Sequence, residues 1–333
     1  MSEVLFAVGD LTDVRFCTSP LWETVFSVRA FGAPGRFPAL NPWIRAVRSA
    51  LAERDDVAEH LAYLAAFVRS GSWMPDFLTP PPAGRHGELG AELEQMLATP
   101  PERVVADILA CARWRPITRI ARAAAADPEA ALPRLGVAIE AWHGLAIAPH
   151  WSRMQALHDA DIAYRTRQLS LGGLRLLFDS LHPTVRWAED RLISEDPWNI
   201  TITVAGRGLP LLPSVFGDRR VLWNVRDESQ PQGVYPVRAV GTLWSAAGAD
   251  GVGGAALSRV LGPARAEVFT LLRGPATTTD LARRTGLSLG AVSQHLGALR
   301  GAGLAQRARH GREVFYEVTP IGAALLRVNG LAD

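Results

Sequence analysis

The spacing of apolar residues changes near residue 198, where a long helical part gives way to a strand-rich part. Up to about residue 195, apolar side chains recur at steps of three and four residues, which is the period of one face of an α-helix. From 198 to 204 they alternate with polar side chains, and this two-residue period is typical of a β-strand. Similar runs follow at 209–216, 221–225 and 234–240. The pattern predicts a mainly α protein with a small antiparallel β-sheet.

Proline and glycine mark the helix starts and breaks of the first part. Ser19 precedes a proline that fits the first helical turn, so a helix is expected to begin there. A long helical stretch, 142–181, is interrupted at Pro149 and weakened by the two glycines 172–173. Residues 4–17 predict two short strands, and the sequence leaves their pairing open.

Two short helices joined by a turn are predicted near the C-terminus. Thr277 can cap a helix with its hydroxyl, and Asp280, three residues later, can cap it in return. Gly286 tolerates the positive φ of a helix end, and Ser288 supplies the next N-cap, so the connection is only about three or four residues long. Such a turn between two helices predicts a helix-turn-helix.

The second of these helices has one apolar face and one small, polar face. Three apolar residues at helical spacing are expected in the core: Val292, Leu296 and Leu299. Four residues then point outward: Gly290, Ser293, Gln294 and Gly297. Small residues let a helix lie deep in the major groove of DNA, where Gln and Ser reach the donors and acceptors of the base edges.

A basic hairpin is predicted after the two helices. The segment 304–318 contains two strand-like runs joined by a basic tip with Gly311 at the turn, and positive side chains at this tip suit phosphates or the minor groove. A histidine in mid-helix beside a buried leucine, as at 295, is more often a core or phosphate-side hydrogen-bonding group than a ligand. The predicted DNA contacts are Thr279, Ser288, Gly290, Ala291, Ser293, Gln294, His295, Arg307, Arg309, His310 and Arg312.

The segment 257–326 resembles a winged helix-turn-helix of the ArsR type. The matching residues are Asp280-Leu281-Ala282, Val292-Ser293-Gln294-His295-Leu296, Leu299, Gly303-Leu304 and Gly311-Arg312. The resemblance implies a homodimeric repressor that places two recognition helices in successive major grooves and is released by a ligand. Metal-sensing members carry cysteines at the position of 278–281, where this chain has none, so the resemblance does not extend to thiolate metal sensing. A helix-turn-helix that only mediates dimerisation or protein docking is the alternative, and the basic wing favours DNA.

Length and charge place the DNA-binding part at the C-terminal end. A chain of 333 residues predicts two or three domains, and we expect the boundaries 1–245, a Gly- and Ala-rich linker at 246–256, and the winged helix-turn-helix at 257–333. From 260 to 333, nine arginines oppose five acidic residues, a net charge of +4, whereas the whole chain carries +2. This asymmetry is the electrostatic signature of a nucleic-acid-binding segment.

Cysteine usage and hydropathy predict a soluble, cytoplasmic protein without a membrane partner. The two cysteines, Cys17 and Cys111, are far apart in the sequence, which offers neither a disulfide framework nor a metal cluster and fits a reducing compartment. The first residues lack a signal pattern, and no apolar run approaches the ~20 residues that a membrane span requires.

Few residues in the large first part suggest catalysis or metal binding. His158 and Asp161 are three residues apart on one helical face and could hold a metal, but a third ligand is missing, so a pair satisfied in the core is favoured. The glycines of 206–208 follow a strand without leading into a helix, which predicts a hairpin rather than a dinucleotide site. No glycine turn carries a nucleophilic serine. We expect no catalytic residue, metal or cofactor, and no enzyme activity.

Tryptophans provide the remaining signal for a ligand. All ten precede residue 257, and although most aromatic residues belong to a core, they could also line a cavity for a flat ligand. The candidate ligand residues are Trp142, Trp151 and His158. Our leading hypothesis is a DNA-binding transcriptional regulator, a homodimeric repressor of a double-stranded operator whose N-terminal domain responds to a small organic effector. The alternatives are an N-terminal enzyme, a protein-interaction module, or a metal-responsive repressor.

Overall fold

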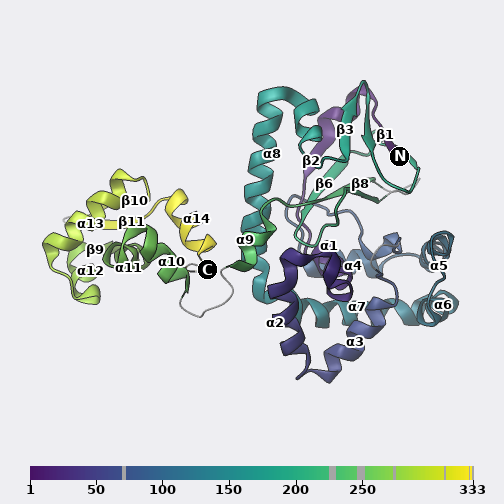
Figure 1. Cartoon of the computed structure of the whole chain (residues 1–333), viewed down its shortest axis with the longest axis horizontal. Helices are drawn as coiled ribbons and strands as arrows, with labels where there is room; N and C mark the ends of the chain where they lie inside the picture. Colours follow the sequence, from purple (N-terminus) through teal and green to yellow (C-terminus); the bar gives the residue numbers. More distant parts are fainter. Residues whose placement is uncertain are drawn as a thin grey trace. The chain divides into compact units, whose positions relative to one another are not determined.

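The computed structural model describes residues 1–69, 73–224, 230–245, 252–272, 275–310, 313–329 and 331. The chain divides into two compact units, Met1–Gly241 and Thr242–Asp333 (Figure 1). Part of the predicted linker, 246–251, lies outside the described residues, and the rest of it begins helix α10 (Val252–Leu261). Helix α9 (Val240–Ser245) spans the division between the units.

The N-terminal unit is mainly helical, as the apolar spacing predicts. Its helices are α1 (Pro20–Gly32), α2 (Asn41–Leu51), α3 (Asp55–Ala65), α4 (Leu89–Leu97), α5 (Pro101–Ala110), α6 (Arg119–Ala126), α7 (Pro128–Ala146) and α8 (Trp151–Asp179). Helix α1 begins as predicted, because the Ser19 hydroxyl accepts a hydrogen bond from the Trp22 amide at 3.0 Å. Residues 20–30 of this helix are all buried, so α1 runs through the core of the unit.

Helix α8 shows the interruptions that proline and glycine predict. Helix α7 ends at Ala146, and a short 3₁₀ turn, η6 (Ala148–His150), contains Pro149. Within α8, Gly172 and Gly173 leave helical geometry, and Gly173 has a φ of +66°, which glycine adopts without steric cost. The residues after this break, among them Phe178, turn into the core of the β-structure.

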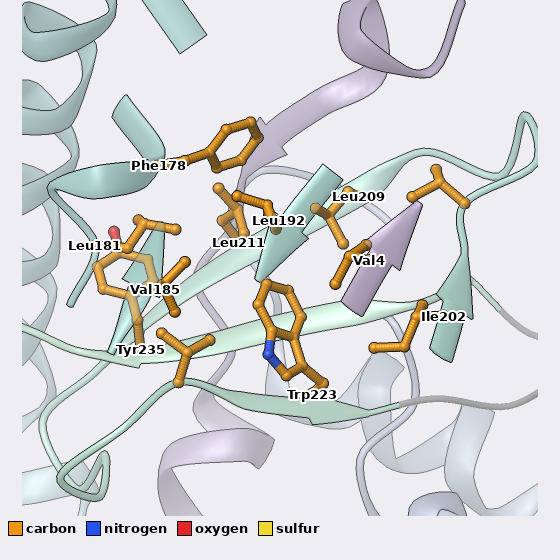
Figure 2. Packing of buried hydrophobic residues seen from close by; sticks show 12 residues of the cluster. Val4, Phe178, Leu181, Val185, Leu192, Ile202, Leu209, Leu211, Trp223 and Tyr235 are labelled. Carbon is orange, nitrogen blue, oxygen red and sulfur yellow. The ribbon is translucent and has the colours of Figure 1, made fainter. Parts of the chain in front are cut away.

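Two four-stranded sheets complete the N-terminal unit. One contains β1 (Ser2–Leu5), β3 (Val185–Ala188), β4 (Arg191–Ser194) and β5 (Thr201–Thr203) in the order β3-β4-β1-β5. The other contains β2 (Val14–Phe16), β6 (Leu209–Ser214), β7 (Leu222–Asn224) and β8 (Gln232–Pro236) in the order β2-β6-β8-β7. Figure 2 shows buried side chains from both sheets, including Val4, Leu211 and Trp223, meeting in one cluster with Phe178.

The pairing of these strands corrects several details of the sequence-based prediction. The strands β1 and β2 join the sheets, but β1 pairs with β5 and β2 with β6 in parallel, so this region is not purely antiparallel. Parallel pairing needs a long crossover, and the helices between β2 and β6 supply it. The turn at 206–208 is not a hairpin, because β5 and β6 belong to different sheets. The β3–β4 hairpin, built on Glu189 with a φ of +57°, was not predicted.

The C-terminal unit has a helical core and a three-stranded antiparallel sheet. After α10 come α11 (Pro263–Leu271), β9 (Ala276–Thr277), α12 (Thr278–Thr285), α13 (Leu289–Gly301), β10 (Ala305–His310), β11 (Glu313–Val318) and α14 (Pro320–Val328). The sheet order is β10-β11-β9. One cluster of buried residues from every helix of this group holds the unit together, among them Leu257, Phe269, Leu281 and Leu326.

Candidate nucleic-acid interface

The turn between α12 and α13 forms as its residues predict. The Thr277 hydroxyl accepts a hydrogen bond from the Asp280 amide at 3.2 Å and so caps α12. Helix α12 ends at Gly286, whose φ of +69° is the left-handed conformation that favours glycine at a helix C-terminus. The Ser288 hydroxyl then caps α13 by accepting from the Ala291 amide at 3.2 Å. Local hydrogen bonds therefore set the direction of α13.

Burial fixes which face of α13 is available to a partner. Val292, Leu296 and Leu299 are at most 1% exposed and pack against Leu281 of α12 in the core cluster. The opposite face is exposed and presents the residues Gly290, Ser293, Gln294 and Gly297. This agrees with the outward face that the sequence predicts, and its two polar side chains carry the donors and acceptors that base edges require.

The remaining predicted contacts on these helices fall into two groups. Thr279 and Ser288 are exposed, although the Ser288 hydroxyl is already engaged as a cap. Ala291 and His295 are half-buried. The Nδ1 atom of His295 is buried and has no hydrogen-bond partner in the described part of the chain, so His295 lies at the edge of the core rather than on the exposed face.

The strands β10 and β11 form the predicted wing. They pair antiparallel from Ala305 opposite Val318 to His310 opposite Glu313. Arg307 is exposed on β10. Arg309 and His310 belong to β10 by their backbone, and their side chains are not described, while Gly311 and Arg312 lie outside the described residues.

Helix α12 carries two exposed arginines that the predicted contact set omits. Arg283 and Arg284, in the last turn of α12, are exposed and form ion pairs with Asp280 at 2.8 and 3.7 Å. A surface hollow of about 520 Å³ lies next to Arg283, lined by Thr277, Thr278, Thr279, Asp280 and Val314. In helix-turn-helix proteins the first helix crosses the DNA backbone, so two consecutive arginines in its last turn are a sequence signal that the predicted contact set did not include.

Comparison with known families agrees with this geometry. Residues 261–306 match the family described as a helix-turn-helix domain. The C-terminal unit carries a helix-turn-helix domain. The match covers α11 to the start of β10, and the structure adds the second wing strand, β11, and α14. Comparison with curated proteins finds no match to the chain.

The predicted ligand residues of the N-terminal unit are mainly core residues. Trp142 is fully buried and its indole N–H donates to the Ser27 hydroxyl at 2.8 Å. His158 is fully buried, and its Nε2 lies 2.7 Å from the Glu23 carboxylate. The half-buried ring of Trp151 lies 6.0 Å from the His158 ring. Trp142 and the Nε2 atom of His158 therefore take part in hydrogen bonds of the core.

The His158–Asp161 metal site is not formed. Glu23 accepts from the Ser214 hydroxyl and the Val215 amide at 2.7 Å each, so its contact with His158 belongs to a buried hydrogen-bond network. Asp161 instead pairs with Arg165 at 3.2 Å. The described residues contain no group of three side chains that could hold a metal ion.

Neither cysteine has the environment of a reactive thiol. Burial raises the pKa of Cys17, and burial raises the pKa of Cys111 to about 12. Both thiols therefore stay protonated at neutral pH. No described helix is long and apolar enough to cross a membrane.

Proposed function

We propose that this chain is a transcriptional regulator that reads double-stranded DNA with α13. The observation that carries the proposal is the exposed, small and polar face of α13 within a helix-turn-helix domain. Gln294 can bind adenine through two hydrogen bonds, and Ser293 can bind most bases. Gly290 and Gly297 add no side-chain bulk, so the helix approaches the base edges closely.

Phosphate contacts come from the elements on either side of α13. Arg307 on the wing and Arg283 at the end of α12 are exposed. Arg309 and Arg312 follow Arg307 in the sequence and are proposed to add to these contacts. Contacts of this kind supply affinity and orientation without sequence information.

We infer that the regulator is a homodimer. Three large apolar side chains are exposed on the first and last helices of the C-terminal unit: Val260 at 82%, Ile321 at 68% and Val328 at 62%. A second copy of the chain would cover these side chains, and the resemblance to ArsR-type proteins, which are homodimers, supports this choice of partner. A two-fold dimer would place two α13 helices in successive major grooves.

The N-terminal unit is proposed to relieve DNA binding when it binds a small organic effector, which makes the protein a repressor. The resemblance to ArsR-type regulators supports ligand-relieved binding. Two observations disfavour a metal effector: residues 278–281 lack cysteine, and His158 is paired with Glu23.

Selection of bound sequences from a pool of random duplexes tests the proposed function with the full chain. The expected product is an inverted repeat whose half-sites lie about 10 base pairs apart, one helical turn. Gln294→Glu places a carboxylate on the reading face and should abolish the enrichment, whereas Glu317→Gln on the wing should not. A pool that remains random after selection would overturn the proposal.

A further inference from the structure

Four tryptophans that are far apart in the sequence surround a small cavity in the N-terminal unit. The cavity has a volume of about 40 Å³. It is lined by Trp22, Phe26, Arg29, Trp73, Met74, Asp76, Trp198, Leu222, Trp223 and Asn224. The half-exposed rings of Trp73 and Trp198 meet edge to face at 5.5 Å, and Trp198 also meets the exposed Trp114 at 4.6 Å. An aromatic wall therefore leads from the cavity to the surface.

The cavity is lined by a buried arginine, Arg29, whose positive charge has no carboxylate within hydrogen-bond distance among the described residues. The side chain of Arg29 is 7% exposed, and burial lowers the pKa of its guanidinium. Within the described residues its ionic partner is Asp218 at 3.8 Å, beyond hydrogen-bond distance. Asp218 also binds Arg36 at 2.8 Å, so one carboxylate serves two guanidinium groups. The guanidinium also lies 5.3 Å from the centre of the Phe26 ring, and Asp76 is a second carboxyl in the lining of the cavity. A buried guanidinium gains most from an acceptor at hydrogen-bond distance, and a ligand carboxylate would supply one to Arg29.

Other polar groups of the cavity are also held loosely. The Asn224 amide donates to the Thr79 carbonyl and hydroxyl at 3.4 and 3.5 Å, at the limit of a hydrogen bond. The indole N–H of Trp223 is buried without a hydrogen-bond partner in the part of the chain that is described. A ligand with acceptor oxygens would satisfy such donors.

We propose that this cavity binds a small aromatic carboxylate, whose ring lies among Trp22, Trp73 and Trp198 and whose carboxylate pairs with Arg29. Aromatic side chains favour a flat ring, and a guanidinium matches a carboxylate with two parallel hydrogen bonds. A space of about 40 Å³ holds only water, so binding requires the half-exposed Trp73 and Trp198 to turn aside. Such a ligand would be the effector of the proposed regulator. This role as an effector site rests on the proposed function, whereas binding of the ligand to the cavity does not.

The cavity is lined in part by β7, which pairs with β8, the last strand before the C-terminal unit in the sequence. Trp22 donates from its indole N–H to Gln232 of β8 at 3.1 Å, and β7, which carries Leu222 to Asn224, pairs with β8. Beyond β8, the Arg238 amide donates to Asp161 at 3.2 Å, and its guanidinium lies 3.6 Å from the centre of the Tyr164 ring. The chain then continues into α9. A shift of Trp22 on ligand binding would therefore act on the segment that precedes the second unit.

Calorimetry on the full chain without DNA tests the site. The probes are benzoate, phenylacetate and indole-3-acetate, each compared with its neutral amide. We expect at least one acid to bind more tightly than its amide. Arg29→Met should weaken that acid by about 10–100-fold, the value of a hydrogen-bonded charge pair, and leave the amide unchanged. Arg36→Met is the matched control, because Arg36 is the other cation that pairs with Asp218 but does not line the cavity. This substitution should change the affinity for the acid less than about twofold.

Two further measurements keep the test decisive. Trp198→Ala changes a half-exposed side chain, so the chain should fold and lose affinity for the acid even if Arg29→Met does not fold. No binding of any acid, equal binding of acid and amide, or equal losses in Arg29→Met and Arg36→Met would overturn the site. Binding of an acid that leaves DNA affinity unchanged would support the site and overturn only its role as an effector site.

Discussion

Glu92→Gln should remove part of the pH dependence of folding in the N-terminal unit. Glu92 is 3% exposed, and its Oε2 accepts from the Leu21 amide at 3.0 Å, in the first turn of the helix that carries Trp22 and Arg29. Its Oε1 is buried without a partner in the described residues. Burial raises the pKa of Glu92 to about 7, against the opposing effect of the Leu21 amide.

The sign and size of the effect follow from proton linkage. Between about pH 4.5 and pH 7 the folded chain keeps the Glu92 proton while the unfolded chain has lost it, so the free energy of unfolding falls as pH rises through this window. The part of this shift that titrates between pH 5 and pH 8 corresponds to roughly 2–3 kcal/mol. Gln cannot ionise, so the difference in unfolding free energy between pH 5 and pH 8 should shrink by about that amount.

Urea unfolding followed by tryptophan fluorescence measures this difference. Nine of the ten tryptophans lie within Met1–Gly241, so the signal reports on the N-terminal unit. Glu94→Gln, on the exposed face of the same helix, is the control and should keep the wild-type pH dependence. The other titrating groups are shared by the wild type and the Glu92→Gln variant, so their contributions cancel when the two pH dependences are compared. If Glu92→Gln shows the wild-type difference between pH 5 and pH 8, the assignment of a neutral, buried Glu92 is wrong.

Three further predictions concern the C-terminal unit and its regulation. Ser288→Ala removes the cap of α13, at a cost of about 1 kcal/mol, so amide exchange in 289–301 should accelerate roughly fivefold by mass spectrometry, while the exposed Ser293→Ala should leave it unchanged. Arg307→Ala and Arg283→Ala should each weaken binding to all duplexes and reduce the slope of log affinity against log salt by about 0.9 per subunit, or about 1.8 for the dimer, whereas an unchanged slope would place that arginine away from phosphate. Zinc should leave DNA affinity unchanged, because His158 is bound to Glu23, and a zinc-induced release that His158→Ala abolishes would contradict the buried network.

The helix-turn-helix could be predicted because its signals are local. The caps Thr277 and Ser288 act within three residues of themselves, and Gly286 ends α12 through its own backbone conformation. The burial of Val292 and Leu296 follows from helical period alone. Such features need no knowledge of distant parts of the chain.

The N-terminal unit depends on contacts that no local pattern contains. Alternating apolar residues identify a strand but not its partner or direction, so the parallel pair of β2 and β6 could not be derived. His158 and Glu23 are 135 residues apart, and the nearby Asp161 looked the better partner in the sequence. For the same reason the sequence points to Trp142 and Trp151 as ligand residues, whereas the tryptophan-lined cavity contains Trp22 and residues near 73, 198 and 223, which are far apart in the sequence.

Operator affinity of Gln294→Ala tests the central claim, that α13 reads DNA bases, most directly. The measurement compares the full chain and the variant on the selected operator and on a random duplex, with Gln306→Ala, whose amide binds Glu317 on the wing, as the control. We expect a loss of about 1–3 kcal/mol per half-site on the operator, nearly unchanged affinity for the random duplex, and no loss in the control. Equal losses on both duplexes would contradict the claim, because Gln294 would then contribute to backbone binding or to folding and not to base recognition.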